Sequence, residues 1–144
     1  VASGTRIEIE AFDTGHLWLA KALADEGIIP DPVLVQLCMG VPWGAPDDLN
    51  TFMAMVNNVP KHWHWSAFAL GRHQMPYVAA AVLGGGNVRV GLEDNLWLDK
   101  GVLATNAQLV ERAAGIIENL GARVITPAEV RARLKVEKRA PVAK

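Results

Sequence analysis

The segment NVRVGLED, residues 87–94, combines two faces of opposite character in one predicted strand. Side chains alternate between the two faces of a strand, so Val88, Val90 and Leu92 form an apolar face while Arg89 and Glu93 lie on the other. In an open antiparallel sheet the charged face would simply meet water. In a parallel sheet both faces are normally covered, so charges there must be paired, bound to a metal or lining a cavity.

The rest of the chain predicts a parallel sheet. Strands are expected over residues 5–12, 33–39, 65–70 and 87–92, and a helical pattern of apolar residues follows each of them. Capping boxes at Thr105–Gln108 and Thr126–Glu129 predict the start of the last long helix and of a short helix after it. Strands that alternate with helices indicate right-handed crossover connections, hence an α/β fold. Each unit takes roughly 35 residues, close to the ~31 of a (β/α)8 barrel, also called a TIM barrel.

Composition limits the function classes. A chain of 144 residues with 51% apolar and 20% charged residues is long enough for one folded domain and excludes a disordered chain. With 14 Lys and Arg against 15 Asp and Glu, no overall basic field for nucleic acid exists. The tail from about residue 131 holds six basic residues and one acidic residue. Because the tail has no aromatic residue for stacking on bases, we interpret it as a solvated end.

Cysteine content and hydropathy favour a cytoplasmic protein without membrane contact. Cys38 is the single cysteine and lies in an apolar run, which predicts a buried, inert thiol. No secretory-signal pattern is evident, and the longest nearly apolar stretch, residues 75–86, is too short to span a membrane.

Charged residues gather where the predicted strands end. Glu10, Glu93 and Asp94 fall at carboxyl ends of strands, which is where barrel active sites lie. Adjacent carboxylates leaving a strand are expected to point to different sides, so one can bind a metal while the other acts as a base. Arg89 would then be a fixed positive charge beside them. The alternative is an internal ion-pair network between Arg6, Arg89 and the glutamates.

Three motifs resemble one enzyme family. EIEAFDTGHL (8–17), GRHQMP (71–76) and GNVRVGLEDNLWLDKGVLATNAQLVERA (86–113) are similar to the C-terminal part of the β-keto acid cleavage enzymes, the 3-keto-5-aminohexanoate cleavage family. The resemblance covers nearly the whole chain. It implies a (β/α)8 barrel nearly twice this length, of which residues 1–144 would supply the C-terminal four units. The implied reaction converts a β-keto acid and acetyl-CoA into acetoacetate and a new acyl-CoA.

The resemblance also implies a role for four residues. Glu93 matches the family's metal-ligating glutamate, for zinc or another divalent metal. Asp94 matches the catalytic aspartate, which takes a proton from the carbon next to the keto group. Arg89 matches the arginine that assists this aspartate and the developing negative charge. Glu10 resembles a position that faces the distal end of the substrate.

The histidines of this chain depart from the family pattern. The family's other metal ligands are a His-x-His pair in the half that this sequence lacks. His62 and His64 also form a His-x-His pair, and alternating histidines on a strand can bind one metal. They begin the third strand, however, a strand length of ~17–20 Å from the end that holds Glu93, which favours a surface or packing role. Arg72 and His73 follow that strand, either as contacts to a substrate carboxylate or coenzyme A phosphate, or as a loop anchored by hydrogen bonds.

We expect the C-terminal half of a metal-dependent β-keto acid cleavage enzyme, with two other classes kept open. One is a non-catalytic α/β binding domain in which the charged strand faces are structural. The other is a split enzyme, whose second half-barrel comes from another chain. Four parallel strands leave two open edges, so we expect a homo-oligomer or association with the missing half-barrel.

Overall fold

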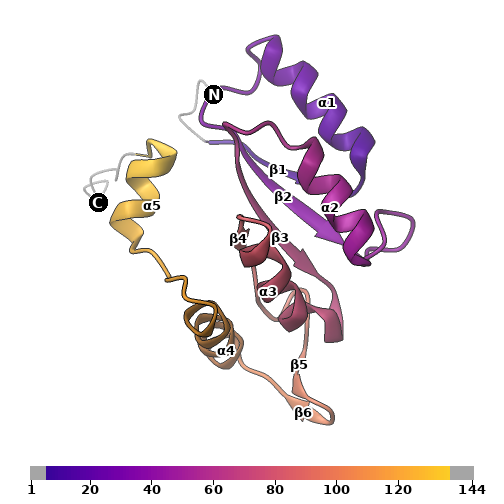
Figure 1. The fold of residues 1–144 in the computed structure, drawn as a ribbon, viewed down its shortest axis with the longest axis vertical. Helices are drawn as coiled ribbons and strands as arrows, with labels where there is room; N and C mark the ends of the chain where they lie inside the picture. Colours follow the sequence, from indigo (N-terminus) through magenta and orange to yellow (C-terminus); the bar gives the residue numbers. More distant parts are fainter. Residues whose placement is uncertain (1–5, 137–144) are drawn as a thin grey trace, which may run out of the picture.

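The computed structural model describes residues 6–136 and contains a four-stranded parallel sheet (Figure 1). The strand order is β1-β2-β3-β4, in the order of the sequence. The strands are β1 (Glu8–Ala11), β2 (Leu34–Met39), β3 (His64–Ala69) and β4 (Asn87–Val88). All three neighbouring pairs are parallel, so the predicted α/β class and strand direction are confirmed.

Helices follow β1, β2 and β3, and α4 follows β4 after a longer connection. The helical elements are α1 (Thr14–Asp25), α2 (Leu49–Asn58), the 3-10 turn η1 (Gly71–His73), α3 (Gln74–Leu83), α4 (Asn106–Asn119) and α5 (Pro127–Leu134). Local signals set their starts: the Asp13 and Asp48 side chains accept hydrogen bonds from the first turns of α1 and α2. Both predicted capping boxes are present, at the starts of α4 and α5.

The two faces of the sheet differ in polarity. Alternate residues of β2 and β3, among them Val35, Leu37, Ala67 and Ala69, are buried in one apolar core with residues of α1, α2 and α3. A second hydrophobic cluster contains Ala113 and Ile117 of α4 and Val78 of α3. The opposite face, which we call the inner face, carries Glu8, Glu10, Gln36, Ser66 and Asn87. The apolar face of the sheet is thus covered by α1 to α4, and the inner face is polar.

The fourth strand is shorter than predicted. Only Asn87 and Val88 pair with β3, although the apolar alternation continues through Val90 and Leu92. The chain instead turns at Gly91, whose carbonyl accepts hydrogen bonds from the Asp94 and Asn95 backbones. The neighbouring strand β3 continues to Ala69, and its Ala67 carbonyl still accepts a hydrogen bond from the Arg89 N–H, so the pairing ends because the chain turns away and not because β3 ends.

The sequence analysis missed a hairpin between β4 and α4. It consists of β5 (Trp97–Asp99) and β6 (Val102–Leu103), which pair antiparallel. Arg112 of α4 binds both carboxylate oxygens of Asp99 and the Leu98 carbonyl, which ties the hairpin to the helix. Strands this short carry too little alternation to be recognised.

The structure describes only the beginning of the basic tail. Of the basic tail expected from about residue 131, the first four residues end α5, and residues 137–144 lie outside the described part of the chain. No helix within residues 6–136 is long and apolar enough to cross a membrane.

Gly86, just before β4, allows a close approach between the chain and an aromatic ring. A Cβ added there would overlap the Trp65 ring, whereas a Cβ on Gly115, inside α4, would meet nothing within 4 Å. We predict that Gly86→Ala lowers the free energy of unfolding by about 1–3 kcal/mol, because Trp65 must shift. Gly115→Ala is the control and should raise it by up to about 1 kcal/mol through helix propensity. Urea unfolding measures both, and equal stability of the two variants would contradict the packing.

Candidate active site

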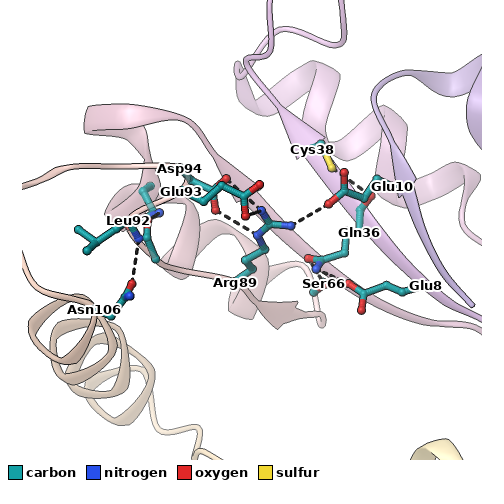
Figure 2. Close-up of polar contacts among 12 residues, drawn as sticks. Glu8, Glu10, Gln36, Cys38, Ser66, Arg89, Leu92, Glu93, Asp94 and Asn106 are labelled. Carbon is teal, nitrogen blue, oxygen red and sulfur yellow. Dashed lines mark hydrogen bonds and ion pairs between the residues drawn. The ribbon is translucent and has the colours of Figure 1, made fainter. Parts of the chain in front are cut away.

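The guanidinium of Arg89 binds three carboxylates (Figure 2). Its Nη1 donates to Glu10 Oε1 at 2.8 Å, and its Nη2 donates to Glu93 Oε2 at 3.0 Å. Toward Asp94 it forms a fork, with Nε to Oδ2 at 3.0 Å and Nη2 to Oδ1 at 3.2 Å. These contacts engage four of the five N–H groups of the guanidinium and leave one on Nη1. We call these four residues the Arg89 cluster.

Elements far apart in sequence bring the cluster together. Glu10 lies on β1, and Arg89, 79 residues later, follows β4 directly. The turn that carries Glu93 and Asp94 is held from two sides. The Gly71 backbone N–H donates to the Asp94 carbonyl at 2.8 Å, and the Leu92 N–H donates to Asn106 Oδ1 at 3.0 Å. The turn is therefore fixed to both η1 and α4, and its side chains have a defined place at the carboxyl end of the sheet.

The two adjacent carboxylates differ in burial and not in direction. Both reach the same guanidinium, so the expectation that they point to different sides is wrong: the turn at Gly91 replaces the strand that would alternate them. The side chain of Asp94 is 5% exposed, and that of Glu93 is 84% exposed. Burial raises the pKa of Asp94 above its ordinary value, and the hydrogen bonds from Arg89 oppose this rise. A buried carboxylate with a raised pKa is suited to proton transfer, and an exposed one to binding a ligand or an ion.

Buried side chains that the sequence analysis did not identify as part of the site pack beneath the Arg89 cluster. The carbon at the centre of the Arg89 guanidinium lies 4.3 Å from the centroid of the Phe68 ring. Phe68 and Cys38 are register partners on β3 and β2, and both are buried. Burial raises the pKa of the Cys38 thiol to about 12, with help from the negative charge of Glu10. The prediction that the thiol is buried is confirmed. The side of the sheet on which Phe68 lies was predictable, because residues 64, 66 and 68 share one strand face, but its place beside Cys38 was not.

A second polar layer crosses the inner face nearer the amino ends of the strands. Ser66 Oγ donates to Gln36 Oε1 at 2.7 Å, and the Gln36 amide donates in turn to Glu8. Gln36 and Ser66 are buried although both are polar. A single polar residue inside the apolar run of β2 was the sequence signal for this layer.

The expected ion-pair network is present in part. Arg89 pairs with Glu10, but Arg6 makes no such pair and donates to the Pro32 carbonyl instead. In the other loop singled out from the sequence, His73 pairs with Asp47 through Nδ1, and Arg72 Nε donates to His73 Nε2 at 3.2 Å. These contacts match the anchored loop expected as one of the two alternatives.

The donor set of this chain does not complete a metal site. Within residues 6–136, no group of three or more His, Cys, Asp or Glu side chains is arranged to hold a metal ion. His64 begins β3, where it pairs in register with Leu34, so the His62–His64 pair lies at the opposite end of the sheet from the Arg89 cluster. With its carboxyls ionised, the cluster holds three negative charges against one positive charge. Of its carboxylates Glu93 is by far the most exposed, and it can offer one ligand.

Arg89 also borders a groove. A hollow of about 840 Å³ lies between the inner face and the segment from the end of α4 to α5. Glu8, Gln36, Ser66 and Arg89 line it from the sheet, and Val130 and Leu134 line it from α5. Residues of the sheet and of the last helix therefore line the same hollow.

Comparison with known proteins places these residues in a family context. A family model described as beta-keto acid cleavage enzyme matches residues 1–136. The chain is 71% identical over 138 residues to the Rhizobium meliloti protein named 3-dehydrocarnitine:acetyl-CoA trimethylamine transferase, which covers 96% of this chain and 46% of that relative.

Other relatives are more distant. Identity is 37% over 139 residues to the 3-keto-5-aminohexanoate cleavage enzyme of Fusobacterium nucleatum, covering 96% of this chain and 50% of the relative. It is 36% over 141 residues to the 3,5-dioxohexanoate:acetyl-CoA acetone transferase of Paraburkholderia graminis, covering 94% and 46%. The chain thus spans about half the length of the curated relatives it matches.

The Arg89 cluster predicts a pH-dependent loss of stability on removal of its cation. Arg89→Met leaves the buried Asp94 carboxylate unpaired, which should lower the free energy of unfolding at pH 7 by about 2–3 kcal/mol. This loss is somewhat smaller than that for a fully buried pair, because the Arg89 side chain is 22% exposed. Without Arg89 the folded state holds the Asp94 proton to still higher pH than the unfolded state. Stability of the variant therefore falls more steeply as pH rises, and its deficit should be smaller at pH 4 than at pH 7.

Urea unfolding at both pH values measures this effect. Arg123→Met is the matched control, because Arg123 pairs with Glu129 on the surface, and it should change stability little at either pH. A deficit of Arg89→Met that is equal at the two pH values, or larger at pH 4, would contradict a buried, Arg89-dependent Asp94.

Proposed function

We propose, since the chain belongs to the β-keto acid cleavage enzyme family, that it forms the C-terminal half of an enzyme that converts a β-keto acid and acetyl-CoA into acetoacetate and a new acyl-CoA. The observation that carries this proposal is the Arg89 cluster, in which a buried carboxylate and a guanidinium with a spare N–H lie together at the carboxyl end of a parallel sheet. That end is the catalytic end in α/β barrels.

The architecture supports four of the eight units of a (β/α)8 barrel, in residues 1–144. The chain covers 46% and 50% of two relatives' lengths. In the described sheet, β1 and β4 each have one unpaired edge, and β4 pairs over two residues only. A strand from a second half would extend the pairing at β4. It would also enclose the polar inner face, as a closed barrel does.

Asp94 would act as the base. Its carboxylate takes a proton from the carbon between the carboxylate and the ketone of the β-keto acid, and the electron pair of that C–H bond forms an enolate. The spare N–H on Arg89 Nη1 stabilises the negative charge on the enolate oxygen. Asp94 and Arg89 already share a hydrogen-bonded fork, so the base and the charge-stabilising group need no reorganisation.

The remaining steps exchange two acyl groups. The enolate carbon attacks the thioester carbonyl of acetyl-CoA, a C–C bond forms, and the coenzyme A thiolate leaves. The thiolate then adds to the original ketone carbon, and the bond between this carbon and the former enolate carbon breaks. The released carbanion takes back the proton from Asp94 and becomes acetoacetate, while the other fragment leaves as acyl-CoA. No oxidant or further reactant is needed.

A divalent metal such as zinc would polarise the ketone oxygen when bound, as a Lewis acid does. This chain would supply one ligand, the exposed Glu93 carboxylate. The two excess negative charges of the Arg89 cluster favour a divalent cation close to it. Because residues 6–136 do not complete a metal site, the other ligands would come from the second half-barrel.

The substrate would be a β-keto acid with a cationic distal end. The relative at 71% identity is named for 3-dehydrocarnitine and a trimethylamine group, and a quaternary ammonium is a fixed cation. Glu10 is half-exposed, and only its Oε1 is engaged by Arg89. Its other oxygen would face the ammonium group, in line with the position that this residue matches in the family.

Completion of the barrel tests the proposal. The part of the Rhizobium meliloti relative outside the matched region is joined to this chain to give what we call the completed chimaera. We predict that the chimaera binds about one zinc ion per chain and forms acetoacetate from 3-dehydrocarnitine and acetyl-CoA, whereas the chain alone binds zinc weakly and forms none. Elemental analysis and a coupled acetoacetate assay give the two readings.

Two matched variants of the chimaera test whether zinc binding depends on Glu93 itself or on the loss of any one carboxylate. Glu93→Gln should lower zinc affinity by more than the ~10–100-fold that loss of a supporting residue costs. Glu111→Gln, at an exposed position of α4, should bind zinc like the unmodified chimaera. Tight zinc binding by the chain alone, or unchanged affinity of Glu93→Gln, would refute the assignment of Glu93.

A further inference from the structure

We propose that Phe68 is a positioning residue, whose ring holds the Arg89 guanidinium in its working orientation. This inference deepens the proposed function and rests on it for the role of Arg89 in turnover. The contact itself stands on the geometry alone. Phe68 belongs to neither the polar groups of the site nor the apolar core that packs against α1–α3.

The centre of the Arg89 guanidinium lies over the Phe68 ring. The distance of 4.3 Å from the Arg89 Cζ to the ring centroid is well inside the ~6 Å range of cation–π contacts. All four hydrogen bonds from Arg89 to the carboxylates form with the ring in this place, so the ring contact and the hydrogen bonds do not compete. The ring fills the space into which the guanidinium would otherwise move. Phe68 is 3% exposed, so its ring is itself fixed by packing.

Phe68 is one of two buried partners that can hold Arg89. Glu10 and Glu93 have side chains that are 46% and 84% exposed, and exposed ion pairs contribute little because water competes for both charges. Asp94 is buried at 5% exposure. The orientation of Arg89 therefore depends mainly on the Asp94 fork and on the Phe68 ring.

These two partners behave differently during the proposed reaction. Asp94 becomes neutral when it holds the proton of the substrate, and its attraction for Arg89 then weakens. The Phe68 ring carries no ionisable group, so its contact with the guanidinium persists through that step. Phe68 thus keeps the spare N–H of Arg89 in place while the enolate exists, which is when it is needed.

Hydrogen exchange of the Arg89 Nε–H tests the contact without any assay of activity. The signal is assigned in the proton–nitrogen spectrum of this chain by its loss in Arg89→Lys. We predict that Phe68→Leu speeds exchange of this N–H about 3- to 10-fold, the range expected from loss of a partly desolvated cation–π contact. Phe68→Met, an unbranched side chain of about the same volume as leucine, should do the same, because it too lacks the aromatic ring.

Phe52→Leu is the matched control. Phe52 is as buried as Phe68, but it lies in α2 and packs against Trp65 and Tyr77. The Phe52→Leu substitution also replaces a buried phenyl ring by leucine, and it should leave the exchange rate of the Arg89 Nε–H unchanged. Unchanged exchange in both Phe68 variants, or equal acceleration in Phe52→Leu, would overturn the proposal.

Turnover of the completed chimaera tests the functional part. Phe68→Leu should lower kcat about 3- to 10-fold with little change in KM, and should add nothing to the loss caused by Arg89→Met. Additive losses would overturn the proposal, since Phe68 would then act independently of Arg89. If Phe68→Leu speeds exchange of the Arg89 Nε–H but leaves kcat unchanged, Phe68 has no role in turnover and the proposal is also overturned. If Arg89→Met too leaves kcat unchanged, the failure lies in the proposed function.

Discussion

One guanidinium links the first strand of this sheet to the turn that follows the last. Arg89 bonds to Glu10 on the first strand and to Glu93 and Asp94 in the turn that replaces the end of the fourth. Remove it, and three carboxylates lie close together with one of them buried. Such an arrangement is costly unless it is paired, and proteins retain costly charges chiefly where chemistry needs them. The Asp94 burial, the spare N–H and the exposed Glu93 end all follow from this one constraint.

The sequence predicted the framework because its signals are local. The threonine capping boxes, the apolar run of β2 and the alternation of strand with helix each act within a few residues, and the structure contains all of them. The Glu93 and Asp94 directions could not be predicted in the same way. The alternation rule holds only within a strand, and the chain leaves β3 for the turn at Gly91, which the alternation of residues 87–92 does not reveal.

Contacts across the sheet were also beyond the sequence. The alternation of β3 places Ser66 and Phe68 on the inner face, but only the register of β2 and β3 sets Phe68 beside Cys38, and only the pairing of β3 with β4 brings Arg89 over the Phe68 ring. The family resemblance supplied roles for Glu10, Arg89, Glu93 and Asp94, and the structure brings all four together. The resemblance did not indicate the Phe68 ring that packs against Arg89. Residues that act through another side chain have no motif of their own.

The central claim, that Asp94 is the base, is tested most directly by proton exchange without acetyl-CoA. The completed chimaera is mixed with 3-dehydrocarnitine in deuterated water, and exchange at the carbon between the carboxylate and the ketone is followed by proton resonance. The account predicts enzyme-catalysed exchange that falls by about 100-fold or more in Asp94→Asn, the scale expected for a general base. Exchange at the same rate in Asp94→Asn as in the unmodified chimaera would contradict it.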